Sequence, residues 1–163
     1  MDDKLLPGGV FTGREAFSQL VRDVFDCAAR EGWPEIILSD ATFEDWPLRE
    51  RSVVESLHAW SASGRRMILL ANRYDDVVRL HARFVSWRRT WDHIIDCRVS
   101  RTLSATDFPS AIWSKHWYLR RMDPRHGNGV CGDDPERLVA LREFLDEIIL
   151  NSSPGFPAST LGL

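Results

Sequence analysis

The chain has 163 residues, of which 44% are hydrophobic and 28% are charged, and its formal net charge is −3. This balance is typical of one globular domain and excludes a disordered or membrane-embedded chain. A net negative charge argues against a protein that binds nucleic acid over its whole surface. The first residues, MDDKLLPGGVF, lack the apolar core of a signal peptide, so we expect a cytoplasmic protein without a membrane segment.

An extension over residues 1–13 precedes the first expected helix. Thr12 and Glu15 have the spacing of a capping box, a hydroxyl followed three residues later by a carboxylate. Apolar residues then recur at helical spacing until Gly32, which together with the following Trp-Pro pair predicts the end of the helix. The short apolar run over residues 35–39 predicts a buried parallel strand.

Helices and strands continue to alternate up to residue 99. A second helix is expected to begin near Asp45, and a second buried strand covers residues 66–71. A third helix leads to a third strand over residues 93–99. This alternation predicts an α/β fold, a three-layer α/β/α sandwich with a mostly parallel sheet of four to six strands.

The chain is rich in tryptophan, with seven in all. Two of them, Trp87 and Trp91, continue an apolar stripe on the third helix at steps of three and four residues. Such a stripe predicts that they face the core. Although aromatic residues at this density also occur on partner surfaces, core packing is our interpretation for most of the seven.

The pattern changes after residue 100. Residues 110–114 and 117–122 predict two short strands, read as a hairpin, and residues 123–134 are rich in turn-forming residues. Asp134 and Pro135 then begin a last helix. We therefore expect a single α/β domain over residues 14–150 and an irregular tail over 151–163, whose apolar end is a candidate strap for a protein partner.

The cysteine content argues against a metal centre. Cys27, Cys97 and Cys131 are far apart in sequence and form no CxxC pair. We expect reduced, mostly buried thiols, as is usual in a cytosolic protein. No cofactor motif is complete, so we expect neither a metal nor a cofactor.

Two segments, EIILSDATFEDWPL and RRMILLANRYDDVVRLHARFVSW, followed by the strand HIIDCRV, resemble the N-terminal part of a phospholipase D-like domain of the kind found in small bacterial proteins. The resemblance spans residues 14–150 and rests on the order of elements. It implies a phospholipase D-like fold. That superfamily builds its site from two copies of the domain, supplied by two domains or by two subunits, so for a single domain the resemblance makes a homodimer a candidate arrangement.

The same resemblance implies a catalytic HxKxxxxD motif, which this chain lacks. His81 and Arg83 give an H-x-R sequence, but Trp87 and Arg88 stand where the motif needs an acid. Near a late strand the order is reversed, as Lys115-His116. His81 and His116 remain the candidate catalytic residues of a divergent site.

Ligands of open α/β sheets bind outside the carboxyl ends of the strands. Asp40, Asn72 and Arg73 follow two of the expected strands and are the best positional candidates for a polar or phosphate ligand. The alternative for these three is ordinary turn chemistry and helix capping. The remaining candidates to bind a ligand are basic: Arg83, Arg98 and Lys115.

We expect a cytosolic phospholipase D-like domain that has lost catalysis and binds a ligand or a protein partner. One alternative is a phosphodiesterase or nuclease whose divergent histidine site is completed by dimerisation. A second is a nucleic-acid-associated accessory protein that uses arginines interleaved with tryptophans. Acidic residues close to those arginines, and the net charge, weigh against nucleic acid as the partner.

Overall fold

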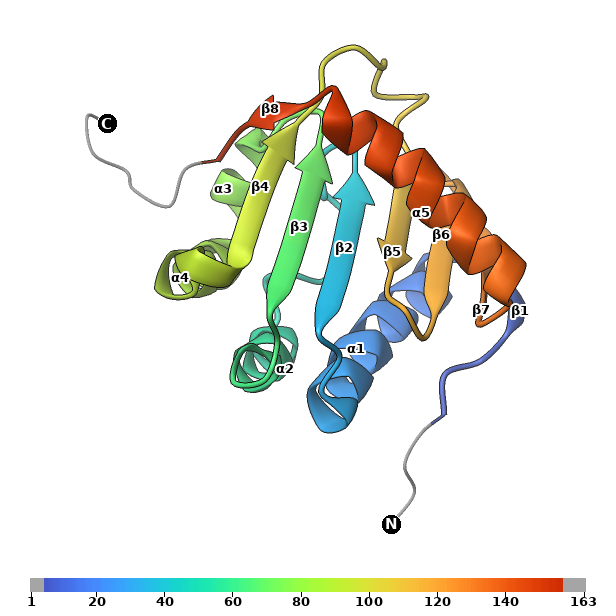
Figure 1. Ribbon diagram of the computed structural model, residues 1–163, viewed down its shortest axis with the longest axis horizontal. Helices are drawn as coiled ribbons and strands as arrows, with labels where there is room; N and C mark the ends of the chain where they lie inside the picture. Colours follow the sequence, from blue (N-terminus) through green and yellow to red (C-terminus); the bar gives the residue numbers. More distant parts are fainter. Residues whose placement is uncertain (1–4, 157–163) are drawn as a thin grey trace.

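One eight-stranded sheet organises the part of the chain that the computed structural model describes, residues 5–156 (Figure 1). The strands are β1 (Gly9–Phe11), β2 (Glu35–Asp40), β3 (Arg66–Ala71), β4 (Ile95–Val99), β5 (Ser110–Trp113), β6 (Tyr118–Asp123), β7 (Asn128–Gly132) and β8 (Ser153–Pro154). The helices are α1 (Arg14–Glu31), α2 (Arg51–Ser61), α3 (Asp75–Leu80), α4 (Ala82–Thr90) and α5 (Pro135–Leu150), with a 3-10 turn at Asp92–Ile94.

The sheet is mixed, with the strand order β1-β7-β6-β5-β2-β3-β4-β8. Only β2, β3 and β4 are parallel, and the other five pairings are antiparallel. The prediction of a mostly parallel sheet is therefore wrong. The reason lies in the connections: helical crossovers join β2, β3 and β4, whereas short loops join β5, β6 and β7, and a short loop permits only antiparallel pairing.

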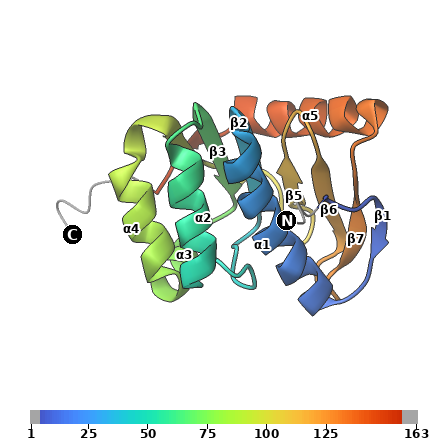
Figure 2. The ribbon, with the colours of Figure 1, turned by 90° about the horizontal axis from the view of Figure 1, so that it is seen from below.

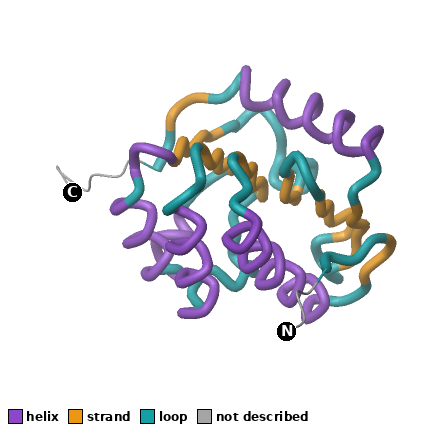
Figure 3. Tube along the Cα trace, turned by 60° about the horizontal axis from the view of Figure 1, so that its bottom comes forward, coloured by secondary structure: helices purple, strands orange, loops and turns teal. Residues whose placement is uncertain are grey.

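Helices cover both faces of the sheet in three layers. Figure 2 shows α5 alone on one face and α1 to α4 side by side on the other, and Figure 3 shows the same separation of helices about the strands. The larger apolar core lies under α1 to α4, where Val21, Val24 and Leu57 meet Leu38 and Leu69. A smaller core packs Leu141 and Leu145 of α5 against the opposite face of the sheet.

Helix α5 begins at Pro135 as predicted, but the capping of α1, the start of α2 and the course of the third helix differ from the prediction. No side chain caps α1, whose first turn is preceded by Gly13; the Gly13 N–H donates instead to Asn128 Oδ1 at 2.9 Å. The capping box at Thr12 is therefore wrong. Helix α2 begins at Arg51 and not near Asp45, because Asp45 is engaged by Arg121. The expected third helix is broken at His81 into α3 and α4.

Most tryptophans lie in the core, as predicted. Six of the seven are buried, and Trp91 is half-buried. The Trp60 indole donates to the Trp33 carbonyl at 2.7 Å, and the Trp87 indole donates to Ser61 Oγ at 2.9 Å. The three cysteines are free and buried, which confirms their expected state.

Residues 128–132, expected as part of a turn, form β7, and residues 153–154 of the expected irregular tail form β8 beside β4. Glycines at 129 and 132 lower the strand signal of β7. Phe156 stacks on Tyr74 with ring centroids 5.1 Å apart. The apolar end of the tail, the candidate strap, lies outside the described residues. No helix within residues 5–156 is long and apolar enough to cross a membrane.

Candidate functional site

A polar cavity of about 640 Å3 opens at the carboxyl end of β2. Asp40 ends that strand, and the turn after it supplies Thr42 and Asp45. The start of α1, the end of α3 and the end of β6 complete the walls. The cavity therefore lies at the edge of the sheet where the three parallel strands end, the usual position of ligands in open α/β sheets.

Arg121 of β6 forms the floor of this cavity and is held on every side. Its Nη2 donates to Asp40 Oδ1 at 3.0 Å, its Nη1 to Asp45 Oδ2 at 2.6 Å, and its Nε to Ser110 Oγ at 2.9 Å. Its guanidinium carbon lies 3.9 Å from the centre of the Phe17 ring. Burial by itself lowers the pKa of Arg121, but the two carboxylates raise it above its ordinary value. The arginine is thus a fixed positive charge.

Asp40 also organises the turn that follows β2. Its Oδ2 accepts the backbone N–H of Thr42 at 3.1 Å and of Phe43 at 2.8 Å. Phe43 has a positive φ of 58°, a conformation that costs energy for a residue with a β-carbon. The Asp40 carboxylate therefore connects Arg121, at the floor of the cavity, to the turn that follows β2.

Four further arginines lie exposed around the cavity: Arg14, Arg49, Arg79 and Arg125. Arg79 pairs with Asp76 at 2.9 Å, and Arg14 Nη2 donates to the Arg125 carbonyl at 2.9 Å. Within residues 5–156, no side chain forms a hydrogen bond or an ion pair with the guanidinium of Arg49 or of Arg125. Five arginines and three carboxylates line the cavity, so its net charge is positive, although that of the chain is negative.

The lining holds no histidine, cysteine or lysine. Its hydroxyl groups belong to Thr42 and Ser110, and Ser110 accepts the Arg121 Nε–H. Among the described residues, neither hydroxyl donates a hydrogen bond to a carboxylate or an imidazole, the contact by which a general base activates a nucleophile. Over the described part of the chain, no three metal-binding side chains gather. The net positive charge of the lining favours an anion over a cation.

The structure brings one of the six predicted ligand residues, Asp40, into this cavity. Asn72 Nδ2 donates to the carbonyls of Ser100 and Leu103, so it closes the loop after β4. Arg73 lines a neighbouring cavity of about 500 Å3 together with Arg101. For Asn72, the contacts are those of a turn residue.

The other three predicted ligand residues lie apart. Arg98 donates to Ser152 Oγ and to its carbonyl at 2.9 Å each, which ties β4 to the segment after α5. Arg83 projects from α4, and its Nη1 donates to the Arg49 carbonyl at 2.9 Å. Lys115 lies in the β5–β6 turn, at the opposite edge of the sheet from Asp40.

The two candidate catalytic histidines lie at opposite edges of the sheet. His81 is fully buried at the junction of α3 and α4, and its Nε2 lies 2.8 Å from the Phe43 carbonyl, so this nitrogen carries the proton. Its Nδ1 has no hydrogen-bond partner, and burial lowers the pKa of the ring. His116 is exposed in the β5–β6 turn, with its ring centroid 5.6 Å from that of Trp33. Within one copy of the chain, these two rings form no common site.

In the sequence, Arg121 counts only among the arginines of a possible nucleic-acid surface, and not among the ligand candidates, although it lies at the centre of the site. The available signal was an arginine pair, Arg120-Arg121, inside the predicted strand 117–122. Neighbouring strand residues point to opposite faces, so one arginine of the pair had to point toward a core and needed a carboxylate partner. The choice of Asp40 and Asp45 as partners depends on the pairing of β5 with β2, which local patterns do not show.

The fold is shared with proteins of known structure. TrmBL2, described as an archaeal chromatin protein with a novel mode of DNA binding, superposes with a TM-score of 0.66 at 11% identity, over 93% of this chain and 55% of its own. Nuc from Salmonella typhimurium, described as a phospholipase D family member, superposes with a TM-score of 0.61 at 11% identity, over 93% of this chain and all of its own. The chain has a phospholipase D-like fold.

This chain spans about half of the TrmBL2 chain. No family model and no curated protein sequence matches it. At 11% identity the two superpositions establish the fold and leave the activity open.

Proposed function

We propose that this domain binds a small phosphate ester in the cavity at the carboxyl end of β2 and does not hydrolyse it. The observation that carries the proposal is that five arginines line one cavity and that the guanidinium groups of two of them, Arg49 and Arg125, are not engaged by any described side chain. Arginine is the side chain best suited to phosphate, because its planar fork of N–H groups matches two phosphate oxygens at once.

The size and order of the cavity support this ligand class. A volume of about 640 Å3 lies within the range of sites for small molecules and accommodates a ligand the size of a mononucleotide. Arg121 is held in place by two carboxylates, so its orientation costs no further conformational entropy when a ligand binds. Arg49 and Arg125 supply N–H groups that are not engaged by other described residues.

The lining supports binding without hydrolysis. Histidine attack on phosphorus needs an imidazole at the anion, and the residues around this cavity include none. The alternative, a divergent histidine site completed by dimerisation, requires His81 to leave the core or His116 to meet a second copy. We favour binding over catalysis because His81 is enclosed and hydrogen-bonded.

The nucleic-acid alternative retains one supporting observation. Arg73 and Arg101 line a second cavity beyond the carboxyl ends of β3 and β4, on the same edge of the sheet as the arginine-lined cavity. A single strand that followed this edge would contact both cavities. Steep weakening of its binding with salt would identify this mode.

The experiment is calorimetric titration, in chelator, with three phosphate monoesters: p-nitrophenyl phosphate, glycerol phosphate and AMP. We expect at least one to bind, and we expect the Arg49→Ala/Arg125→Ala double variant to bind it at least tenfold more weakly, since a charged hydrogen bond contributes about 1.5–3 kcal/mol. Arg65→Ala, which removes an exposed arginine at the other edge of the sheet, is the matched control.

A parallel assay follows release of nitrophenolate from p-nitrophenyl phosphate and from its bis diester. Failure of all three monoesters to bind would refute the proposal. Nitrophenolate release that disappears in His81→Ala or in His116→Ala, with folding retained, would establish the enzymatic alternative instead.

A further inference from the structure

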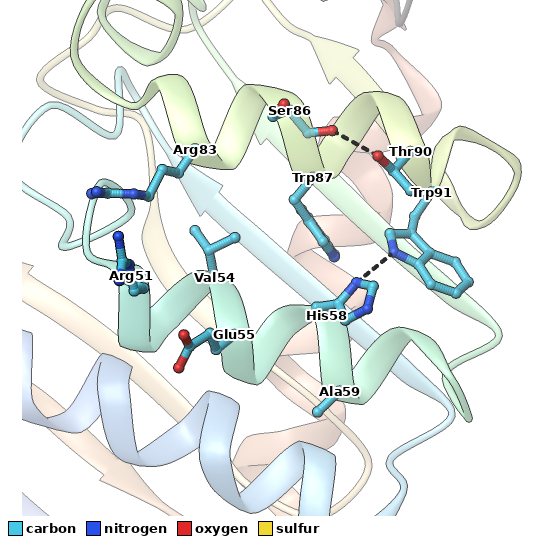
Figure 4. A pocket seen from close by; sticks show the side chains of 10 residues that line it. All are labelled: Arg51, Val54, Glu55, His58, Ala59, Arg83, Ser86, Trp87, Thr90 and Trp91. Carbon is cyan, nitrogen blue, oxygen red and sulfur yellow. Dashed lines mark hydrogen bonds between the residues drawn. The ribbon is translucent and has the colours of Figure 1, made fainter.

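A second concave surface lies away from the phosphate site, between α2 and α4 (Figure 4). The volume of this groove is about 630 Å3. Its surface is mainly apolar and is formed by Val54 and Ala59 of α2 and by Trp87 and Trp91 on the side of α4. Most of the lining side chains are exposed, so the groove is open to solvent along its length.

The aromatic wall of the groove is held in place before any ligand arrives. The Trp87 indole donates to Ser61 Oγ at 2.9 Å and the side chain is buried. The Trp91 indole donates to His58 Nδ1 at 3.2 Å, a contact that Figure 4 shows across the end of the groove. A rigid apolar wall lowers the entropic cost of binding.

The groove has a defined length. Arg51 and His58 lie near its two ends, seven residue steps apart along α2. At 1.5 Å per residue this corresponds to about 10 Å, or two helical turns. A helix laid along it would place two or three side chains at i, i+4 and i+7 on the groove.

One end of the groove carries two positive charges, and the one carboxylate of the lining, Glu55 of α2, forms no ion pair with either of them. Figure 4 shows Arg51 of α2 and Arg83 of α4 at this end. Arg83 Nη1 donates to the Arg49 carbonyl at 2.9 Å, but no carboxylate of the described residues forms an ion pair with Arg51 or Arg83. Two guanidinium groups on facing helices repel each other, and an anion between them removes that repulsion.

We propose that this groove docks an amphipathic helix of a protein partner, with apolar anchors against Val54, Ala59 and the two tryptophans and with an acidic side chain between Arg51 and Arg83. The open side favours a helix over a small molecule, because small-molecule sites enclose most of their ligand, whereas a docked helix leaves its polar face in water. This inference does not depend on the phosphate site.

The test is selection from a displayed library of helical 14-residue peptides, carried out in parallel on the wild-type chain and on Ala59→Arg. Ala59 is exposed, so this change blocks the groove without disturbing the core. Selected peptides are then synthesised in pairs, with the acidic residue or with its amide, and their affinities are measured by fluorescence anisotropy.

We expect selected peptides to share an acidic residue about two turns from an apolar anchor and to bind Ala59→Arg at least tenfold more weakly. We also expect the acid-to-amide change, and Arg51→Ala/Arg83→Ala, each to weaken binding by roughly tenfold, the effect of losing one charged hydrogen bond. Arg89→Ala, an exposed arginine of α4 outside the groove, is the matched control and should leave affinity unchanged.

Three results would overturn the proposal. The first is that the wild-type chain and Ala59→Arg select the same peptides to the same extent. The second is that the affinity of groove-binding peptides does not change when their acidic residue is replaced by its amide, or when Arg51 and Arg83 are replaced by alanine. The third is a wild-type dimer that Ala59→Arg converts to monomer in light scattering, because the occupant would then be a second copy of this chain.

Discussion

The buried ion pair between Arg121 and Asp40 offers the sharpest test of how the arginine-lined cavity is built. The perturbation is Arg121→Met, which keeps an unbranched apolar stem over the Phe17 ring and removes the charge. It leaves the Asp40 carboxylate with two backbone N–H donors but without its cation. The side chains of Arg121 and Asp40 are 1% and 9% exposed, so the pair is buried in the folded chain.

Breaking a buried pair by removing one partner costs about 3–5 kcal/mol. A chain of this length loses roughly 2–4 °C of Tm per kcal/mol, so Arg121→Met should melt about 6–20 °C lower. The second carboxylate provides an internal comparison, because the Asp45 side chain is 42% exposed. We expect Asp45→Asn to cost no more than about 1 kcal/mol, as for other solvent-screened pairs.

The assay is urea unfolding followed by tryptophan fluorescence, with the slope against urea checked for constancy among variants. The double variant Arg121→Met/Asp40→Asn should be less destabilised than the sum of its two single variants, since the uncompensated charge is gone. A loss below about 1 kcal/mol for Arg121→Met, or equal losses for Asp40→Asn and Asp45→Asn, would refute this reasoning about burial.

Two further predictions concern titrating groups. Burial lowers the pKa of His81 in the folded chain, so the unfolded chain takes up a proton at higher pH than the folded chain does. The free energy of unfolding should therefore fall as the pH drops below about 6.5, by at most about 1.4 kcal/mol per pH unit. His81→Gln, which keeps a donor for the Phe43 carbonyl, should flatten that slope. Burial also raises the pKa of the thiols of Cys27, Cys97 and Cys131 to about 11 each. Iodoacetamide at pH 8 should therefore label these cysteines only after the chain unfolds.

Each of these two predictions has its own check. His93→Gln, which alters an exposed ring, should leave the pH slope of wild type in place, and a His81→Gln chain with an unchanged slope would contradict the assignment to His81. Mass spectrometry measures the labelling, and full modification of the native chain faster than it unfolds would contradict the burial of the thiols.

The site was far less predictable than the elements that carry it. Asp40 could be found from its place after a buried strand, and it does line the cavity. The resemblance singled out His81, but in the structure its ring is enclosed by the core. Arg121 and Arg14 could not be assigned to the site, because they are more than 80 residues apart from one another and meet only where β6 and the start of α1 close on the same cavity.

The sequence by itself determined the α/β class, the three parallel strands, the β5–β6 hairpin, the buried tryptophans and the start of α5 at Pro135. These features follow from local periodicity, from glycine and proline, and from runs of buried apolar residues, all of which act within a few residues. Only the tertiary structure decided that β5 runs antiparallel to β2, and hence that Arg121 faces Asp40. Strand pairing is a contact between distant segments, and the free energy that selects one partner comes from the packing of the whole sheet.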